Sequence, residues 1–169
     1  MDFATLFKRA TGFAPYPYQA RLAAADRLPA RVEIPTGLGK TAAVVLAWLW
    51  RRRYAPDAIR VATPRRLVYC LPMRVLVEQT ASCARAWIDN IGLADTVEGS
   101  RSDGVDVHLL LGGDVDRDWD RFPERDAILV GTQDMLLSRA LDRGYATSRF
   151  RWPLAFGLLN NDCLWVMDE

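Results

Sequence analysis

The fold is decided by the stretch Ile34-Pro35-Thr36-Gly37-Leu38-Gly39-Lys40-Thr41. It follows a β-type run at Arg31–Ile34 and opens a predicted helix over Thr41–Arg53, the context that a phosphate-binding loop requires. The two glycines let the backbone turn its N–H groups toward phosphate oxygens, and the N-terminus of the helix adds partial positive charge. The stretch therefore predicts a site for a phosphorylated ligand.

Lys40 and Thr41 carry the chemistry of this loop. Lys40 would reach the β- and γ-phosphates of a nucleotide, and Thr41 would place its hydroxyl on Mg²⁺. Lys8 is the only other lysine in the chain, and nearly all other positive charges are arginine. A lysine at position 40 is therefore notable, because its compact ammonium suits a phosphate site. The loop departs from the usual pattern at its first position, which is Ile34 and not glycine, so Pro35 must start it in an extended conformation. The alternative is a plain glycine turn with an incidental lysine. We predict that the nucleotide is bound by Thr36, Gly37, Leu38, Gly39, Lys40 and Thr41.

Composition narrows the class of protein. The chain has 169 residues with 22 Lys+Arg against 21 Asp+Glu, a net charge of +1. This balance excludes a uniformly basic DNA-coating protein but leaves room for a local basic groove. No apolar run is long enough to span a membrane, and the N-terminus lacks the pattern of a signal peptide. Three cysteines without a CxxC pair and a single histidine argue against a disulfide framework and a structural zinc site. We expect a soluble cytoplasmic chain of one domain, without a membrane partner.

Strand-like and helical segments alternate along the chain. Short β-type runs lie at Arg31–Pro35, Leu67–Leu71, Val105–Leu111, Ala127–Thr132 and Cys163–Asp168. Helices are predicted at Tyr18–Arg27, Thr41–Arg53, Arg74–Asn90 and Gln133–Arg143. Thr41–Leu49 is apolar almost all round, so this helix should be buried against a sheet. The alternation predicts a parallel, doubly wound α/β sheet that binds ligands at the carboxyl ends of its strands.

Two acidic residues, Asp168 and Glu169, follow the last apolar strand. Asp168 would hold Mg²⁺ directly or through a water molecule, and Glu169 would orient or deprotonate an attacking water. Two acids at the end of a chain are weak evidence alone, because a solvated terminus looks the same. Together with the phosphate loop they become the expected partner element.

Further polar or glycine residues follow the other predicted strands. Pro72 and Arg74 follow Leu71, and Thr132 and Asp134 lie where the next strand meets a helix. Helix N-termini there can hold nucleic-acid phosphates without reading sequence, although a plain helix cap explains Thr132 and Asp134 equally well. Gly112-Gly113 permits close backbone approach to a ligand, and a simple loop is equally compatible with it.

Gln19 lies near the start of a helix about 15 residues before the phosphate loop. Its amide has both an acceptor and donors, so it can address the N6 and N7 edge of adenine. A neighbouring aromatic residue could stack on the base. A proline-rich entry to a helix with core aromatics is the alternative.

The motifs IPTGLGKT, LPMRVLVEQT, LLGGD, VGTQDML and a terminal MDE, in this order, resemble the first RecA-like lobe of superfamily 2 helicases. The resemblance covers Tyr16–Glu169. The sequence from Gly112 to Glu169 resembles the CRISPR-associated helicase–nuclease of type I systems, in the variant called type I-G, formerly I-U. The resemblance implies an ATP- and Mg²⁺-dependent motor that pulls single-stranded DNA after recruitment by an RNA-guided surveillance complex, with an HD-type nuclease that degrades the strand.

By this resemblance, Gln19 recognises adenine, Lys40 and Thr41 serve phosphate and Mg²⁺, and Asp168 and Glu169 begin the metal-and-water motif. The positions that track a DNA strand are Pro72, Arg74, Gly112, Gly113, Thr132 and Asp134.

The same resemblance sets an expectation for domain organisation. Residues 1–169 would form an incomplete N-terminal ATP-binding lobe, truncated at the Asp-Glu motif, while a second RecA-like lobe and the HD nuclease would belong to a longer protein. An arginine from a second lobe is typically worth 10³–10⁵ in rate, so we expect this chain to bind nucleotide without efficient turnover. The alternatives are another superfamily 2 DNA or RNA helicase lobe, a small-molecule kinase, or a non-catalytic nucleotide-binding module.

Overall fold

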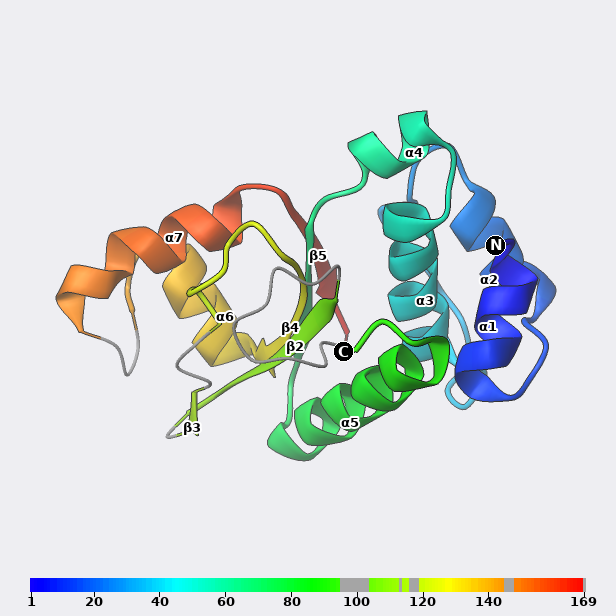
Figure 1. Ribbon diagram of the computed structural model, residues 1–169. Helices are drawn as coiled ribbons and strands as arrows, with labels where there is room; N and C mark the ends of the chain where they lie inside the picture. The colour runs from blue at the N-terminus through cyan, green and yellow to red at the C-terminus, as the bar shows by residue number, and fades with distance from the viewer. Residues whose placement is uncertain (95–103, 113, 116–118, 145–147, 169) are drawn as a thin grey trace. The chain divides into compact units, whose positions relative to one another are not determined.

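The computed structural model describes residues 1–94, 104–112, 114–115, 119–144 and 148–168. The chain divides into two compact units (Figure 1). Unit 1 comprises Met1–Thr63 together with Asp89–Gly92, and unit 2 comprises Pro64–Ile88 together with Leu93–Glu169. Among the described residues, no helix is both long and apolar enough to cross a membrane.

Unit 1 is helical. Its helices are α1 (Phe3–Thr11), α2 (Pro17–Ala24), α3 (Lys40–Arg53) and α4 (Asp57–Ala62). Helix α1 begins where the side chain of Asp2 accepts a hydrogen bond of 2.8 Å from the backbone N–H of Thr5, which satisfies one of the unpaired donors of the first turn. Helix α3 is buried over most of Ala43–Leu49. It packs on α1, α2 and α4, and its predicted packing against a sheet stays a prediction.

A buried arginine fixes the end of α2 to α3. Arg51 is only 5% exposed, and its guanidinium donates to the carbonyls of Ala23, Ala25 and Asp26. Burial lowers the pKa of Arg51, but the group still carries its charge at neutral pH, because carbonyl oxygens are good acceptors for a guanidinium. Arg51 therefore caps α2, although an arginine at this place in the sequence suggests only a solvated helix end.

Unit 2 contains a sheet of the order β3-β2-β4-β1-β5. The strands β2, β4, β1 and β5 are parallel, and the two-residue strand β3 pairs antiparallel with β2. The strands are β1 (Arg66–Leu71), β2 (Val105–Leu111), β3 (Asp114–Val115), β4 (Asp126–Thr132) and β5 (Cys163–Met167). The helices are α5 (Arg74–Ile91), α6 (Gln133–Ala140) and α7 (Trp152–Asn160), the last preceded by a 3₁₀ turn η1 (Arg149–Arg151).

Helices α6 and α7 cover one face of this sheet (Figure 1). The contact is a cluster of buried side chains from three strands, both helices and the segment before β4: Val68, Cys70, Leu110, Trp119, Ala127, Leu129, Leu136, Ala140, Ala155 and Leu159. Because side chains alternate along a strand, the intervening residues such as Leu67 and Tyr69 face the opposite side. Both faces of β1 are buried, as expected for the interior of a parallel sheet.

Arg66, the first residue of β1, links three segments at the N-terminal end of this strand. Its guanidinium donates to the carbonyls of Pro123 (2.9 Å), Leu158 (3.1 Å) and Asn161 (2.7 Å). One side chain at the start of β1 thereby holds the segment before β4 and the end of α7.

The three cysteines are free. Cys70 is buried in β1, and burial raises its pKa. Burial also raises the pKa of Cys163 at the start of β5. Cys83 on α5 is exposed.

Four predicted strands are confirmed, with ends that differ by at most one residue: Leu67–Leu71, Val105–Leu111, Ala127–Thr132 and Cys163–Asp168 are β1, β2, β4 and β5. The predicted doubly wound α/β class is confirmed as a parallel four-stranded arrangement with flanking helices. The predicted helices over Thr41–Arg53 and Arg74–Asn90 are confirmed as α3 and α5.

The predicted strand at Arg31–Pro35 is wrong. The segment has no strand geometry, and its Arg31 and Glu33 side chains form an exposed ion pair with each other. A strand needs a neighbour to satisfy its backbone groups, and unit 1, all of whose residues are described, contains no strand. The phosphate loop therefore follows an irregular segment in this structure.

Two predicted helices are too long. Helix α2 ends at Ala24, because Ala25 is extended and its carbonyl accepts from Arg51. Helix α6 ends at Ala140, because Asp142 and Gly144 both take positive φ, which a continuing right-handed helix does not allow.

Candidate functional site

The phosphate loop is an exposed turn that leads into α3. Gly37 and Gly39 take φ of 86° and 75°, a left-handed conformation that glycine adopts without a steric penalty. Gly39 is the N-cap of α3 and has no side chain to cap the helix. The N–H groups of the first turn therefore lack a side-chain partner from the cap, and they are the donors that a phosphate would use.

Two side chains of α2 form hydrogen bonds with carbonyls of the phosphate loop. The amide Nε2 of Gln19 donates to the carbonyl of Gly39 at 3.1 Å, and the hydroxyl of Tyr18 donates to the carbonyl of Leu38 at 2.6 Å. Burial raises the pKa of Tyr18, so its hydroxyl keeps its proton at neutral pH. Both loop carbonyls are thereby hydrogen-bonded to side chains of α2.

The side chain of Gln19 is buried, with 2% of the residue exposed, and both ends of its amide form hydrogen bonds. Its Oε1 accepts a hydrogen bond of 2.7 Å from the backbone N–H of Tyr16, and its Nε2 is within 3.4 Å of the Tyr18 hydroxyl. In this structure Gln19 links α2 to the loop. Its role in reading adenine stays a prediction.

In unit 2, the strand ends that sequence reasoning singled out meet at one edge of the sheet. Leu71 is paired with Thr132, Leu110 with Gly131, and Cys70 with Met167. The residues that follow these strands, among them Pro72, Gly112 and Asp168, therefore leave the sheet side by side. The sequence places them up to 96 residues apart, and the parallel register brings them together.

Asp168 is fixed at this edge by two hydrogen bonds. Its backbone N–H donates to the carbonyl of Cys70 at 3.0 Å, which extends the ladder between β5 and β1. Its carboxylate Oδ2 accepts from the hydroxyl of Tyr69 at 2.9 Å. The predicted partner Glu169 lies outside the described residues, as does Gly113.

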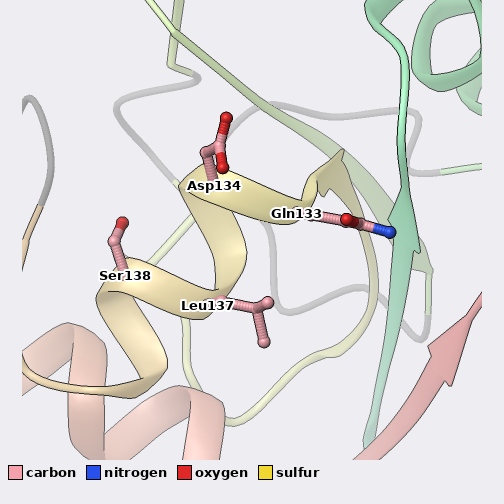
Figure 2. A pocket seen from close by; sticks show the side chains of 4 residues that line it. All are labelled: Gln133, Asp134, Leu137 and Ser138. Carbon is pink, nitrogen blue, oxygen red and sulfur yellow. The ribbon is translucent and has the colours of Figure 1, made fainter.

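The start of α6 presents an exposed polar face. Thr132 is the N-cap of the helix, yet its side chain makes no capping hydrogen bond, so capping alone does not explain a threonine there. Asp134 and Ser138 lie one helical turn apart and project from the same side of α6 (Figure 2). With Gln133 and Leu137 they line a pocket of about 460 Å³.

The start of α5 is exposed as well. Pro72 and Arg74 both lie at the surface, and the Arg74 guanidinium contacts the carboxylate of Glu78 one turn later at 2.9 Å. An exposed pair of this kind contributes little to stability, and the role of Arg74 in binding a DNA strand stays a prediction.

The family model for DEAD/DEAH box helicases matches residues 17–169. The chain belongs to this family. The match begins at the first residue of α2 and includes Gln19, the phosphate loop, the sheet edge and the Asp-Glu motif. No curated protein matches the chain.

Membership in the DEAD/DEAH box helicase family identifies the α/β fold as RecA-like and implies the use of ATP, typically with Mg²⁺. The donors present fit that ion. Mg²⁺ prefers hard oxygen ligands and usually takes one or two carboxylates with substrate phosphates and water. The carboxylate of Asp168 in unit 2 is a ligand of this kind, and so is the hydroxyl of Thr41 in unit 1. The described residues contain no group of three or more acidic, histidine or cysteine side chains that could hold a metal ion.

Sequence reasoning missed three residues of this DEAD/DEAH box helicase domain that shape its candidate site. Tyr18 and Tyr69 position the loop and Asp168, respectively. Gly131 lies where an added Cβ would be 2.7 Å from the carbonyl of Leu110 and 2.9 Å from Leu136, so only glycine lets α6 pack this closely on β4 and β2. The one available signal was a tyrosine inside the buried run LVYCL, because a buried hydroxyl needs a partner.

Proposed function

We propose that this chain is the ATP-binding lobe of an ATP-dependent helicase or translocase that acts on single-stranded DNA. The observation that carries the proposal is the shared sheet edge, where the residues after β1, β2, β4 and β5 leave the sheet together. An exposed edge with helix starts and a glycine suits a nucleic-acid backbone, because phosphates are bound by N–H groups and cations without base readout.

In this proposal each predicted residue has one task. The backbone of Thr36–Thr41 and the ammonium of Lys40 bind the nucleotide phosphates, and Gln19 addresses the base. Thr41 and Asp168 would each offer an oxygen to Mg²⁺, which would neutralise charge on the phosphates when bound. Glu169 orients the attacking water.

The DNA strand is proposed to follow the sheet edge. The positions assigned to it are Pro72, Arg74, Gly112, Gly113, Thr132 and Asp134.

We further propose a role in type I CRISPR interference in the cytoplasm. The support is the sequence similarity of Gly112–Glu169 to the helicase–nuclease of those systems. The partners would be an RNA-guided surveillance complex that recruits the motor, a second RecA-like lobe and an HD nuclease. Binding to a purified type I surveillance complex loaded with target DNA would test this role, and absence of binding to the loaded complex would contradict it.

The test of nucleotide binding is the affinity for a fluorescent ATP analogue in the presence of Mg²⁺. Lys40→Ala should weaken binding at least tenfold, because the ammonium that would pair with the β- and γ-phosphates is lost. Lys8→Ala is the matched control, since it removes the only other lysine, which is exposed on α1. Equal affinities for wild type and Lys40→Ala would overturn the proposal.

Single-stranded DNA separates a motor from the alternatives. A change in nucleotide affinity on adding an oligonucleotide is expected of a motor lobe, because the two ligands are then coupled. Nucleotide binding that ignores DNA would favour a kinase or a plain nucleotide-binding module.

A further inference from the structure

We infer that Tyr69 is a positioning residue for Asp168, and this inference rests on the proposed metal-dependent binding of nucleotide. The Tyr69 hydroxyl lies 2.9 Å from Oδ2 of Asp168. It donates its proton to this oxygen, so Oδ1 would be the oxygen that a metal ion uses. The side chain thereby selects one orientation of the Asp168 carboxylate.

The strand register explains why this contact forms. Tyr69 is paired with Val166, so Asp168, which directly follows β5 and lies two residues beyond Val166, has its side chain on the same face of the sheet. At this position the Tyr69 hydroxyl reaches the Asp168 carboxylate. Phenylalanine would fill the same space, because the Tyr69 ring is buried at 1% exposure, but it could not donate a hydrogen bond.

Asp168 needs such a partner because it lies directly after the end of β5. Its backbone is fixed by the bond to the carbonyl of Cys70, whereas its side chain is only half-buried. A carboxylate without a second hydrogen bond can rotate and present either oxygen. Groups that orient metal-binding side chains typically change metal affinity or activity by 10–100-fold.

The experiment measures Mn²⁺ binding as a substitute for Mg²⁺, in the presence of a non-hydrolysable ATP analogue. The loss of the free Mn²⁺ signal in electron paramagnetic resonance gives the half-saturating concentration. Tyr69→Phe should raise this concentration about tenfold and leave metal-free nucleotide affinity unchanged. Tyr54→Phe is the matched control, since it removes a tyrosine hydroxyl elsewhere, and it should match wild type.

A double variant separates positioning from a structural effect. In an Asp168→Asn background, Tyr69→Phe should add little to the metal requirement, because the carboxylate that it orients is already gone. Urea unfolding of each variant monitors the fold.

Three outcomes decide the matter. A wild-type metal requirement in Tyr69→Phe would overturn the role of Tyr69 while leaving the proposed function standing. A further large increase in the double variant would also overturn it, because Tyr69 would then act independently of Asp168. Failure of the wild-type chain to bind metal with nucleotide would overturn the proposed function, and the role of Tyr69 with it.

Discussion

The phosphate loop and the sheet edge are positioned by different means. The loop is irregular, and its shape depends on two positive-φ glycines and on side chains of α2 that bind its carbonyls. The sheet edge is set by strand pairing over long sequence distances, with residues of β1, β4 and β5 in register. From this comparison we expect that removal of one hydroxyl group weakens the loop. The sheet edge should be weakened only by a substitution that alters the packing of its strands.

The largest effect is expected at the edge. Gly131→Ala would place a Cβ 2.7 Å from the Leu110 carbonyl, a backbone atom of the sheet that cannot move away cheaply. Overpacking of this kind costs about 1–3 kcal/mol of unfolding free energy, which urea denaturation would measure. Gly112→Ala is the control, because a Cβ there meets no atom within 4 Å. Equal stability of the two variants would show that the edge is as adaptable as the loop.

A smaller effect is expected at the loop. Tyr18→Phe removes the hydrogen bond to the Leu38 carbonyl and should lower the free energy of unfolding by about 0.5–1.5 kcal/mol. Nucleotide affinity should fall by less than about tenfold, because the N–H donors of the loop remain. Tyr16→Phe leaves that bond in place and serves as the control. Unchanged nucleotide affinity in Tyr18→Phe would mean that the loop keeps its shape without the Tyr18 hydroxyl.

The smallest effect on stability is expected for Arg74→Ala. Its exposed pair with Glu78 contributes little, so unfolding free energy should change by less than about 0.5 kcal/mol. If the sheet edge follows a DNA strand, affinity for single-stranded DNA should fall, and the slope of log K against log salt should shrink by about 0.7. Arg60→Ala removes a comparable exposed pair with Asp57 and should leave the slope unchanged. An unaltered slope in Arg74→Ala would exclude a phosphate contact at the start of α5.

The four parallel strands could be predicted because their apolar runs are local signals. The glycine turn that leads into α3 could be predicted for the same reason, since the spacing of its glycines is a local signal. The strand at Arg31–Pro35 failed, because five residues of β-type sequence do not specify a partner. Helix α1 was missed although its signal was present: Phe3, Leu6, Phe7 and Ala10 repeat with a helical period and are buried.

Helix α7 and the contact between Tyr69 and Asp168 could not be predicted from local sequence patterns. Helix α7 has the sequence WPLAFGLLN, which contains no charged residue and shows no clear polar face. The contact between Tyr69 and Asp168 joins residues 99 apart and depends on which strands are neighbours. Sequence patterns predict that strands exist, but their order follows from packing across the whole sheet.

The unequal burial of the three cysteines has a practical consequence for following this protein in solution. A thiol reacts as its thiolate, and burial disfavours that form at Cys70 and Cys163, whereas Cys83 is exposed on α5. A maleimide dye should therefore label the unaltered chain first at Cys83. That label would sit in the helix that begins with Arg74, so its fluorescence could report on ligands at the start of α5 without any engineered substitution.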